Sequence, residues 1–593
     1  MDEAKIKLIR MKFKYILLFS LFVSVLQAKS ENTNFQNLIS IFESEYRALN
    51  IPYIQLSYKA NLENIDSRTV LKTQKTFFLK YQKSLRAFLN SALSKNEQLT
   101  LEVLLYEIDL NLERVDLETK WNTRNYEVKG NRIVDEYLGK QWYIYFLKKW
   151  VDKDLNPDSA YAFGLKEIKK VKKRMMNLQS EIETYTSKHP SLDNDYLLSD
   201  KDLIIEKYNA LNLKVIKNAQ RYFPFIDEIP AIQVAQGTNQ AMAIAPAYYG
   251  NNTFYFNFFQ NNYDSRDMGW VFIHEAVPGH HYQHYINQKM SDPTRSQFQY
   301  MGYLEGWGAY IEQFGKMLGA YKTPLDTYAQ MEWDLIRSVR VALDVGLNYY
   351  GWSDEEAFAF WEKHIKNKPD IAQREITRMK RWPAQVITYK YGEQVLNELK
   401  GDIHSAEALK NFHQQVLEDG VLPLSILKKN VLRKQDIQSK KEREHQSKLL
   451  TIDQTINSLY QVISGAKGEE RDWDFLRYLF HPEAKFIFSG NRKDGSFGAK
   501  YVTMDDYIKT SGTFMLEKGF YENEIHRVTE QFGNIAHVFS TYECFHNKDD
   551  EKPFMRGINS IQLMFTGNRW QVISIYFTQE TEEYPIPEKY LEN

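Results

Sequence analysis

The apolar residues of this chain change their spacing at a highly charged segment between Ser425 and Leu450. Before that segment, stretches such as LTLEVLLYEIDLNLERVDL place apolar residues three and four positions apart, which is the spacing of amphipathic α-helices. After it, AHVFSTYECF, GINSIQLMFT and RWQVISIYFTQ alternate apolar and polar residues, as half-buried β-strands do. A chain of 593 residues is also too long for one hydrophobic core. We therefore predict two domains, joined by a charged linker at residues 431–450.

The first predicted domain, residues 29–430, should be mainly α-helical with a small β-sheet. The sheet is indicated by QAMAIAPAYYGNNTFYFNFF, in which aromatic and apolar residues alternate on both sides of Asn251 and Asn252, the pattern of a short hairpin. The second domain, residues 451–593, should be α+β, because helical patterns at about 452–464 and 473–479 precede its strands.

The N-terminus has the pattern of an export signal. We predict a signal peptide at residues 1–28, with Met11 as a candidate start, because Lys12 and Lys14 precede the apolar run YILLFSLFVSVL and Ala28 is a small residue suited to cleavage. A membrane anchor is the alternative, but a run of about a dozen residues is short for one. No cysteine lies at the end of the run, so a lipid anchor is not predicted. We expect an exported protein, periplasmic or secreted, without a stable membrane span once the signal is removed.

Charge and cysteine content exclude several classes of partner and linkage. The chain carries 76 basic and 77 acidic residues, a formal net charge of −1, so no overall positive field favours nucleic acid or anionic lipid. Cys544 is the single cysteine, which excludes an intramolecular disulfide. Partners must therefore be inferred from local sites.

The segment FIHEAVPGHHYQ contains a histidine–glutamate pair followed by two more histidines. Zinc hydrolases of the H-E-x-x-H type place two histidines four residues apart on one helix, with the glutamate as general base. Here that fourth position is Pro278, which disfavours one continuous helix through the motif. If the chain bulges there, His280 can return to the position of the second ligand beside His274. On an undistorted helix, His281 would share the His274 face instead, so His281 is the alternative ligand.

A third ligand is offered by YMGYLEGWGAYIEQ, in which Glu305 lies on what should be the next helix. Two histidines and one glutamate leave a position of Zn²⁺ open for water, which is the arrangement of a catalytic site. Glu275, directly after His274, would be the general base on that water. The alternative is that the two histidines are ordinary polar helix residues and Glu305 is a surface carboxylate.

HEAVPGHH and EGWGAY together resemble the bacterial family DUF885, which is similar to zinc peptidases of the gluzincin type. The stretches that begin at Arg337, Glu375 and Phe412 resemble later signatures of that family, so the likeness covers about residues 34–430. It implies a gluzincin-type, mainly helical fold around a deep cleft with zinc at its floor, and hydrolysis of peptide bonds. Two positions depart from the family pattern: Asn348 stands where a histidine is usual, and Met379 stands where an aromatic residue is usual.

These departures raise the question of which group would stabilise the oxyanion of the reaction. Tyr389, in the retained segment YKYG, is our candidate donor, and a core aromatic residue is the alternative reading. Arg337, Arg340 and Asp344 share one side of a predicted helix. Asp344 could hold a ligand histidine in one tautomer, and an arginine could bind a substrate carboxylate. Simple ion pairs within the helix would be the alternative.

The hairpin before the motif, with TFYFNF as its second strand, could present an edge on which a peptide substrate lies extended beside Glu275. In the C-terminal domain, FHPEAKFIFSG followed by three long strands resembles the cone-like α+β fold of the nuclear-transport-factor-2-like (SnoaL-like) superfamily. Its members serve as small enzymes, binding modules or dimerisation units. We expect a binding or dimer-forming accessory here, with a homodimer formed through its exposed sheet face.

Three functions are therefore compared: a zinc metallopeptidase, a zinc hydrolase of non-peptide amides, and a catalytically impaired binding protein on the same scaffold. The first is preferred. Retention of Glu275 argues against the third, because a binding scaffold needs no general base. Only a comparison of substrates separates the first two.

Overall fold

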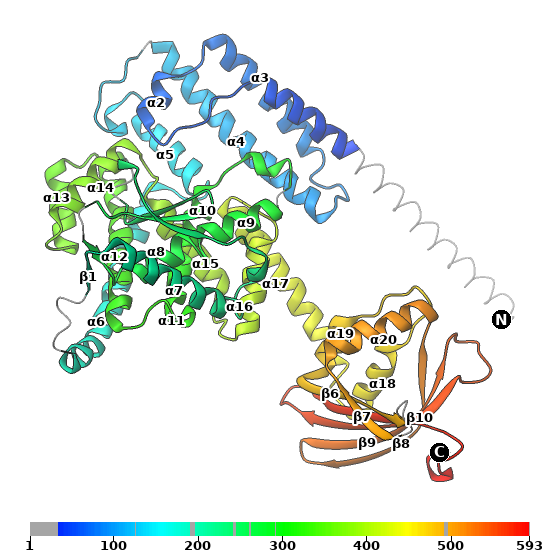
Figure 1. Ribbon diagram of the computed structural model, residues 1–593. Coiled ribbons are helices and arrows are strands. Elements are labelled where there is room, and N and C mark those ends of the chain that lie inside the picture. The colour runs from blue at the N-terminus through cyan, green and yellow to red at the C-terminus, as the bar shows by residue number, and fades with distance from the viewer. Residues whose placement is uncertain are drawn as a thin grey trace. The chain divides into compact units, whose positions relative to one another are not determined.

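The computed structural model describes residues 34–124, 126–189, 196–240, 245–259, 262–290, 292–491 and 496–591. The chain forms two compact units, an N-terminal unit (Met1–Leu432) and a C-terminal unit (Arg433–Asn593), shown in Figure 1. The predicted signal peptide lies outside the described residues. Among those residues, none of the helices is both long enough and apolar enough to cross a membrane.

The N-terminal unit is built almost entirely from helices, as the spacing of its apolar residues predicts. After a helix at residues 34–48, they are α2 (Tyr58–Glu63), α3 (Arg68–Arg86), α4 (Lys95–Arg124), α5 (Gly139–Trp150), α6 (Pro157–Lys188), α7 (Lys201–Ala219), α8 (Met268–Glu275), α9 (His280–Lys289), α10 (Met301–Ile311), α11 (Gly315–Leu318), α12 (Pro324–Val345), α13 (Asp354–His364), α14 (Pro369–Arg381), α15 (Ile387–Lys400) and α16 (Ala406–Leu417). Helix α17 (Leu424–Ser447) crosses the boundary between the units, so residues 431–447 of the predicted charged linker are part of a regular helix.

Helix α12 is a central element of the N-terminal unit. Its start is fixed by a capping box, in which the Thr323 side chain accepts from the Asp326 backbone while the Asp326 side chain accepts from the Thr323 backbone. Pro324 occupies the first turn, where its missing N–H costs nothing. Every residue from Asp334 to Val345 is buried, and α12 packs closely against α6. Arg337 and Arg340, which were predicted from the sequence to be site residues, therefore lie in the interior.

The small predicted sheet is present before the histidine motif. It contains β2 (Gln233–Gln236), β3 (Ala247–Gly250) and β4 (Thr253–Phe256) in the order β2-β4-β3, with β3 antiparallel and β2 parallel to β4. Asn251 and Asn252 both have positive φ, 49° and 56°, as a tight hairpin turn requires. The second strand of the hairpin, β4, is central, so the two edges of the sheet are β2 and β3. Two further short strands, β1 (Leu197–Leu198) and β5 (Tyr263–Asp264), pair with each other.

Two hydrophobic clusters fill the N-terminal unit. One surrounds α8, α9 and α10, and the other surrounds α5, α6, α12 and α14. Helices α10 and α15 approach so closely that a Cβ on Gly306 would lie 2.5 Å from the Cα of Gly392. Helices α8, α10 and α15 lie near the centre of this unit in Figure 1. The core thus fixes the helices that carry the histidine and glutamate motifs.

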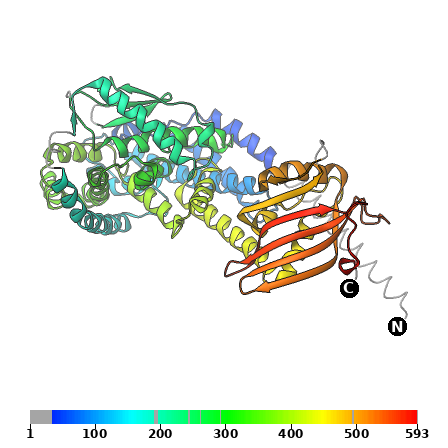
Figure 2. The same ribbon diagram turned by 60° about the horizontal axis from the view of Figure 1, so that its bottom comes forward.

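The C-terminal unit is α+β, as predicted. Its sheet has the order β7-β6-β11-β10-β9-β8, and its strands lie side by side in Figure 2. They are β6 (Phe480–Asn491), β7 (Phe497–Val502), β8 (Tyr521–Phe532), β9 (Ile535–Phe545), β10 (Met555–Phe565) and β11 (Trp570–Gln579), antiparallel except for the parallel pair β6 and β11. Helices α18 (Ile452–Ile463), α19 (Trp473–Leu479) and α20 (Met504–Lys518) pack on this sheet around one hydrophobic core.

Candidate metal centre

The histidine motif is interrupted between two helices. Helix α8 ends at Glu275 and α9 begins at His280, with a cis peptide bond between Val277 and Pro278 in the connecting turn. The turn is tight: a Cβ on Gly279 would lie 1.9 Å from the carbonyl oxygen of His274, so only glycine fits. This turn absorbs the two extra residues of the motif and brings His280 back beside His274.

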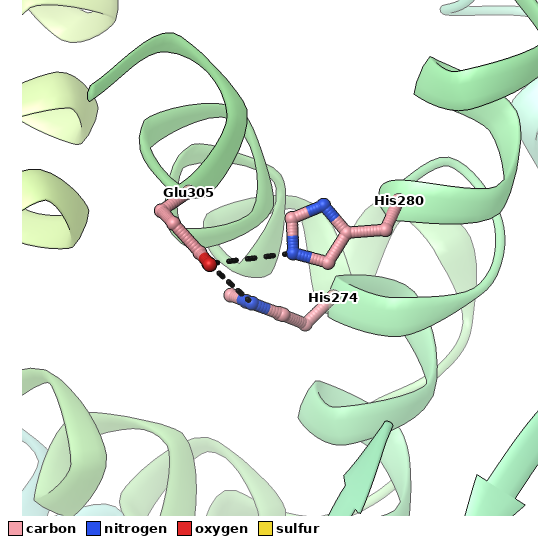
Figure 3. Close-up of side chains that lie close together, drawn as sticks. All are labelled: His274, His280 and Glu305. Carbon is pink, nitrogen blue, oxygen red and sulfur yellow. Dashed lines mark ion pairs between the residues drawn. The ribbon is translucent and has the colours of Figure 1, made fainter. Parts of the chain in front are cut away.

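His274, His280 and Glu305 converge from α8, α9 and α10, as Figure 3 shows. The Nε2 atom of His280 lies 3.4 Å from Oε2 of Glu305, and Nε2 of His274 lies 3.9 Å from the same oxygen. One ligand atom from each of the three residues lies within 4.8 Å of the other two. The sequence motifs, although separated along the chain, therefore form one cluster.

The donor set and its spacing suit a zinc ion. Tetrahedral zinc with bonds of about 2.0–2.2 Å to nitrogen and oxygen places its ligand atoms roughly 3.4 Å apart. The separation between His280 and Glu305 has that value, and the pair His274 and Glu305 is slightly wider. Two imidazoles and one carboxylate also match the ligand types that zinc takes in hydrolases. The three residues present fit Zn²⁺.

Glu312 supports His274 from the side opposite the cluster. Its Oε1 lies 2.8 Å from Nδ1 of His274, while Oε2 accepts from Arg337 at 2.6 Å and from Gln330 at 3.2 Å. Glu312 is fully buried. A hydrogen bond from Nδ1–H to this carboxylate fixes the tautomer and leaves the Nε2 lone pair for a metal. Glu312 is not among the site residues predicted from the sequence, although its position seven residues after Glu305 places both on one helical face.

Gly308 makes room for the imidazole of His274. A Cβ at this position of α10 would lie 2.7 Å from Cε1 and 2.9 Å from Nε2 of His274. Distances below 3.0 Å are too short for real carbon contacts, so any larger residue would displace the ring. The second glycine of EGWGAY therefore has a direct steric role at the site.

Glu275 is held next to the cluster by the edge strand β3. Its Oε2 accepts a hydrogen bond from the backbone N–H of Tyr249 at 3.1 Å. In a hairpin with a two-residue turn, the pair that flanks the turn, here Gly250 and Thr253, is hydrogen-bonded across the strands. The next pair, Tyr249 and Phe254, directs its backbone groups away from the partner strand, so the Tyr249 N–H can bond to Glu275. Burial raises the pKa of Glu275, against the opposing effect of His280 and His274. The carboxyl is thus anchored beside the cluster, with a pKa above its ordinary value.

The cluster is electrostatically coupled when no metal is bound. Burial lowers the pKa of His274, but Glu305 and Glu312 outweigh it and raise this pKa to about 9. His280 behaves similarly, because Glu305 overcomes burial and raises its pKa. Burial opposes ionisation of Glu305, yet its hydrogen bonds to both histidines hold its pKa well below the usual range. The raised pKa of the two histidines and the lowered pKa of Glu305 thus have one cause, the short distances between the three side chains.

His281, the alternative ligand, lies away from the cluster. Its Nδ1 lies 3.2 Å from the Tyr249 hydroxyl, and its Nε2 lies 2.8 Å from the carbonyl oxygen of Pro230. Burial lowers the pKa of His281, which favours the neutral ring. Both ring nitrogens are engaged in the interior, so the structure brings His280 to the cluster and leaves His281 in a packing role.

The roles predicted for Arg337, Arg340 and Asp344 need correction. Arg337 is buried and pairs with Glu312, so it acts behind His274 and is not available to a substrate carboxylate. Arg340 is buried and pairs with Glu375 at 2.7 Å.

Asp344 contacts neither ligand histidine. Its Oδ1 accepts from the Tyr143 hydroxyl at 2.8 Å and from the Ala384 backbone at 3.0 Å, and burial raises its pKa to about 7. The tautomer-fixing role predicted for Asp344 falls to Glu312 instead. The alternative of ion pairs among the three residues is also wrong, because each has its partner on another element.

Tyr389 lies beside the cluster. Its ring is stacked on that of His274 at a centroid distance of 6.3 Å, and its hydroxyl accepts from Nη2 of Arg378 at 3.4 Å. Arg378 also donates to Gln385 at 2.7 Å. Tyr389 is only half-buried, unlike a core aromatic residue.

The two departures from the family pattern touch each other. Nδ2 of Asn348 donates to the backbone carbonyl of Met379 at 3.0 Å, and both side chains are fully buried. Asn348 lies in the π-helical segment Gly346–Tyr350 that continues α12, and Met379 lies in α14. They therefore belong to the packing between these helices.

A cavity of about 510 Å³ opens onto the cluster. Glu275, His280 and Glu305 form part of its wall, and much of the remainder is polar, with Gln283, Asn287, Gln299 and Arg295 among the lining side chains. A volume of this size lies within the range of about 300–1,000 Å³ that is common for ligand pockets.

Comparison with known proteins places the chain in a family. Residues 120–431 match the model of the family described as "Bacterial protein of unknown function (DUF885)", which is more than half of the chain. The chain matches no curated protein. A protein of Colwellia psychrerythraea described as a lipoprotein is similar over 64% of this chain and 72% of its own, with 20% identity and a TM-score of 0.46.

Two further solved structures are similar to parts of the chain. A protein of Shewanella oneidensis, described as a lipoprotein of unknown function, covers 68% of this chain and 78% of its own length, at 16% identity and a TM-score of 0.42. An NTF-2 like protein of unknown function from Silicibacter pomeroyi covers 23% of this chain and 98% of its own, at 14% identity and a TM-score of 0.17. Because the family model matches residues 120–431, the chain belongs to the bacterial family DUF885.

Proposed function

We propose that this protein is a zinc-dependent hydrolase that cleaves peptides, with His274, His280 and Glu305 as zinc ligands and Glu275 as general base. The observation that carries the proposal is the convergence of three ligand atoms within 4.8 Å beside the anchored carboxylate of Glu275. Three protein ligands leave a fourth position open, as catalytic zinc sites do. The likeness to gluzincin-type peptidases supports the same reading.

When bound, zinc would supply a Lewis acid that polarises a substrate carbonyl and activates a water molecule. The protein contributes the remaining steps. Glu275 accepts the proton of the attacking water and returns it to the departing amine, a task that a carboxyl with a raised pKa performs well. Glu312 keeps His274 oriented. Tyr389, beside His274, is the proposed donor to the developing oxyanion.

The edge strand β3 supports a peptide as the substrate. An extended peptide could add to this edge, because backbone hydrogen bonds recognise any sequence while side chains enter alternate pockets. Tyr249 of β3 already places its N–H on Glu275, so a peptide along this edge would lie next to the general base. The adjacent cavity of about 510 Å³ would accept one or two residues. A non-peptide amide remains the alternative substrate class.

We also propose that the protein is exported and that its C-terminal unit is an NTF2-like accessory that binds a ligand or a second copy. The six-stranded sheet with three helices packed on it supports this reading. A homodimer through the exposed sheet face remains a proposal. Sedimentation of the full chain at micromolar concentration as a monomer would count against it.

The decisive experiment is a zinc analysis of the purified protein, combined with anomalous scattering at the zinc edge. We expect one zinc per chain on the three ligands. His280→Ala should lose most of the zinc, whereas His281→Ala, the matched control one residue away, should keep it.

The wild type and both variants should then be assayed on a panel of fluorogenic peptides and simple aryl amides. Hydrolysis of peptides by the zinc-loaded wild type supports the proposal. Retention of zinc by His280→Ala would contradict the ligand assignment. Cleavage confined to the simple amides would replace the peptidase by the alternative hydrolase.

A further inference from the structure

The C-terminal unit contains a second cavity, which the proposed hydrolase function does not use. It has a volume of about 450 Å³ and lies between the helices α18, α19 and α20 and the sheet. Most of its wall is aromatic or aliphatic, and the aromatic part includes the rings of Phe486, Phe488, Tyr507, Phe514, Phe520 and Phe577. Such a volume and lining suit a small apolar molecule.

One acidic side chain interrupts this apolar wall. Glu522, on β8, is the single charged residue among those that line the cavity. Its Oε1 accepts from Nδ2 of Asn559 at 2.9 Å. The same nitrogen donates to the Tyr460 hydroxyl at 3.1 Å, so both amide hydrogens of Asn559 are used. In the described part of the chain, no hydrogen bond reaches Oε2 of Glu522 and no cation pairs with its carboxylate.

A carboxyl group in this position is costly unless something compensates it. Burial disfavours the charged form and raises the pKa of Glu522 to about 7, against the opposing hydrogen bond from Asn559. A side chain that served only to fill space would be apolar here. The single carboxyl therefore indicates a polar partner that enters the cavity.

The other titratable groups that face Glu522 stay neutral. They are Tyr460 of α18, Tyr507 of α20, and Tyr542 and Cys544 of β9, and burial together with the Glu522 charge raises the pKa of each. Glu524, two residues along β8, is occupied by Arg527 at 2.5 Å and does not line the cavity. Among the described residues that line the cavity, none is a cation that could neutralise Glu522.

We propose that this cavity binds a small apolar amine, whose ammonium group pairs with Oε2 of Glu522 while its hydrocarbon part contacts the aromatic wall. Two features favour a cation over a neutral ligand. The carboxylate lacks a counter-charge, and aromatic rings attract a cation through their faces. The stacked pair Phe486 and Tyr507, with centroids 4.3 Å apart, provides a broad ring surface beside it.

The test is calorimetric titration of the full-length protein with phenethylamine and tryptamine, against phenethyl alcohol as a neutral ligand of similar shape. We expect the amines to bind and the alcohol to bind at least about tenfold more weakly. Glu522→Gln should weaken the amines by at least about tenfold and leave the alcohol unchanged. Glu524→Gln, on the same strand but outside the cavity, is the matched control and should leave amine binding intact.

Ser511→Phe provides a second variant that keeps Glu522, because Ser511 of α20 lines the cavity and a phenyl group would fill it. It should abolish binding of all three compounds while circular dichroism remains that of the wild type. Equal binding of the amine and the alcohol would overturn the proposal. So would unchanged amine binding in Glu522→Gln, or failure of both amines to bind the wild type.

Discussion

The Nδ1 atom of His274 lies 2.8 Å from Oε1 of Glu312, and the other carboxylate oxygen of Glu312 lies 2.6 Å from Arg337. This buried chain from arginine to carboxylate to imidazole sets the direction of the His274 ring before any ligand arrives. An imidazole whose Nδ1–H is held in this way presents Nε2 to the cluster at no further conformational cost.

Glu312→Gln should weaken zinc binding by about 10- to 100-fold, because the amide cannot accept both contacts as strongly as a carboxylate and no longer fixes one tautomer. Competition with a chromophoric chelator measures this affinity. Glu375→Gln is the matched control, since Glu375 is also buried and pairs with an arginine, Arg340, but touches neither histidine. Equal loss of zinc affinity in both variants would show that general destabilisation, and not ring orientation, is responsible.

Glu275→Gln should retain zinc and fold but lose turnover by about a hundredfold or more, because the glutamine keeps the size and an acceptor oxygen while removing the base. The acceptor matters, since Glu275 receives the Tyr249 N–H. Rates on the fluorogenic peptides are compared at full zinc occupancy. Near-normal turnover of this variant would exclude the proposed proton transfer.

Gly308→Ala should lower zinc affinity by about tenfold or more, because the new methyl group would lie 2.7 Å from Cε1 of His274 and must displace the ring. Gly164→Ala is the control: its methyl group would lie 2.8 Å from the backbone nitrogen of Ala342, where α6 packs against α12. Both variants should be less stable in thermal unfolding, but only the first should lose zinc affinity. An unchanged zinc affinity in Gly308→Ala would contradict the steric role.

Zinc binding should strengthen as the pH rises. The pKa of His274 in the metal-free protein is raised from 6.5 to about 9, so its proton stabilises the fold below the ordinary pKa and that contribution is lost as the pH rises through about 9. Zinc must displace this proton, and its apparent affinity should increase by up to about tenfold per pH unit below 9 for each proton released. Chelator competition at a series of pH values measures the slope.

Glu312 is one of the groups that raise the pKa of His274, which gives this pH dependence an internal control. In Glu312→Gln, zinc affinity should level off at a lower pH than in the wild type. A flat profile between about pH 6 and 9 in the wild type would mean that His274 is neutral without metal.

The cluster of His274, His280 and Glu305 could be predicted from the sequence because residue type and spacing carry the information. Histidine and glutamate are the residues that zinc binds, and Pro278 signals that the helix is interrupted. The choice between His280 and His281 required the backbone of the turn, which depends on the tight contact of Gly279 with the His274 carbonyl. Spacing alone cannot supply such a contact.

The errors arose where long-range partners decide the role of a residue. Helical periodicity places Arg337, Arg340 and Asp344 on one side of a helix, but it does not say which other elements pack there. Their partners, Glu312, Glu375 and Tyr143, lie on other elements. A helix face predicted from sequence is therefore an incomplete description of an ion-pair network.

How clearly a strand could be predicted from the sequence depended on how much of it is buried. Strands β9, β10 and β11 lie inside the sheet and alternate clearly in sequence, whereas β7 and β8 are its two edges. The segment YENEIHRVTEQF of β8 carries polar residues on both faces of the strand, and its C-terminal part is exposed to solvent. An edge strand with little to bury leaves little trace in the hydrophobic pattern.

Gly308 and Gly279 have no functional groups, yet the imidazole and the carbonyl of His274 occupy the space that their side chains would fill. In a library of all single substitutions, both positions should therefore tolerate as little change as the histidines themselves. A search profile built only from chemically reactive residues would discard this information. Relatives that keep His274, His280 and Glu305 but carry bulkier residues at these two glycine positions should form a separate group, in which the geometry of the site has changed or the site has been lost.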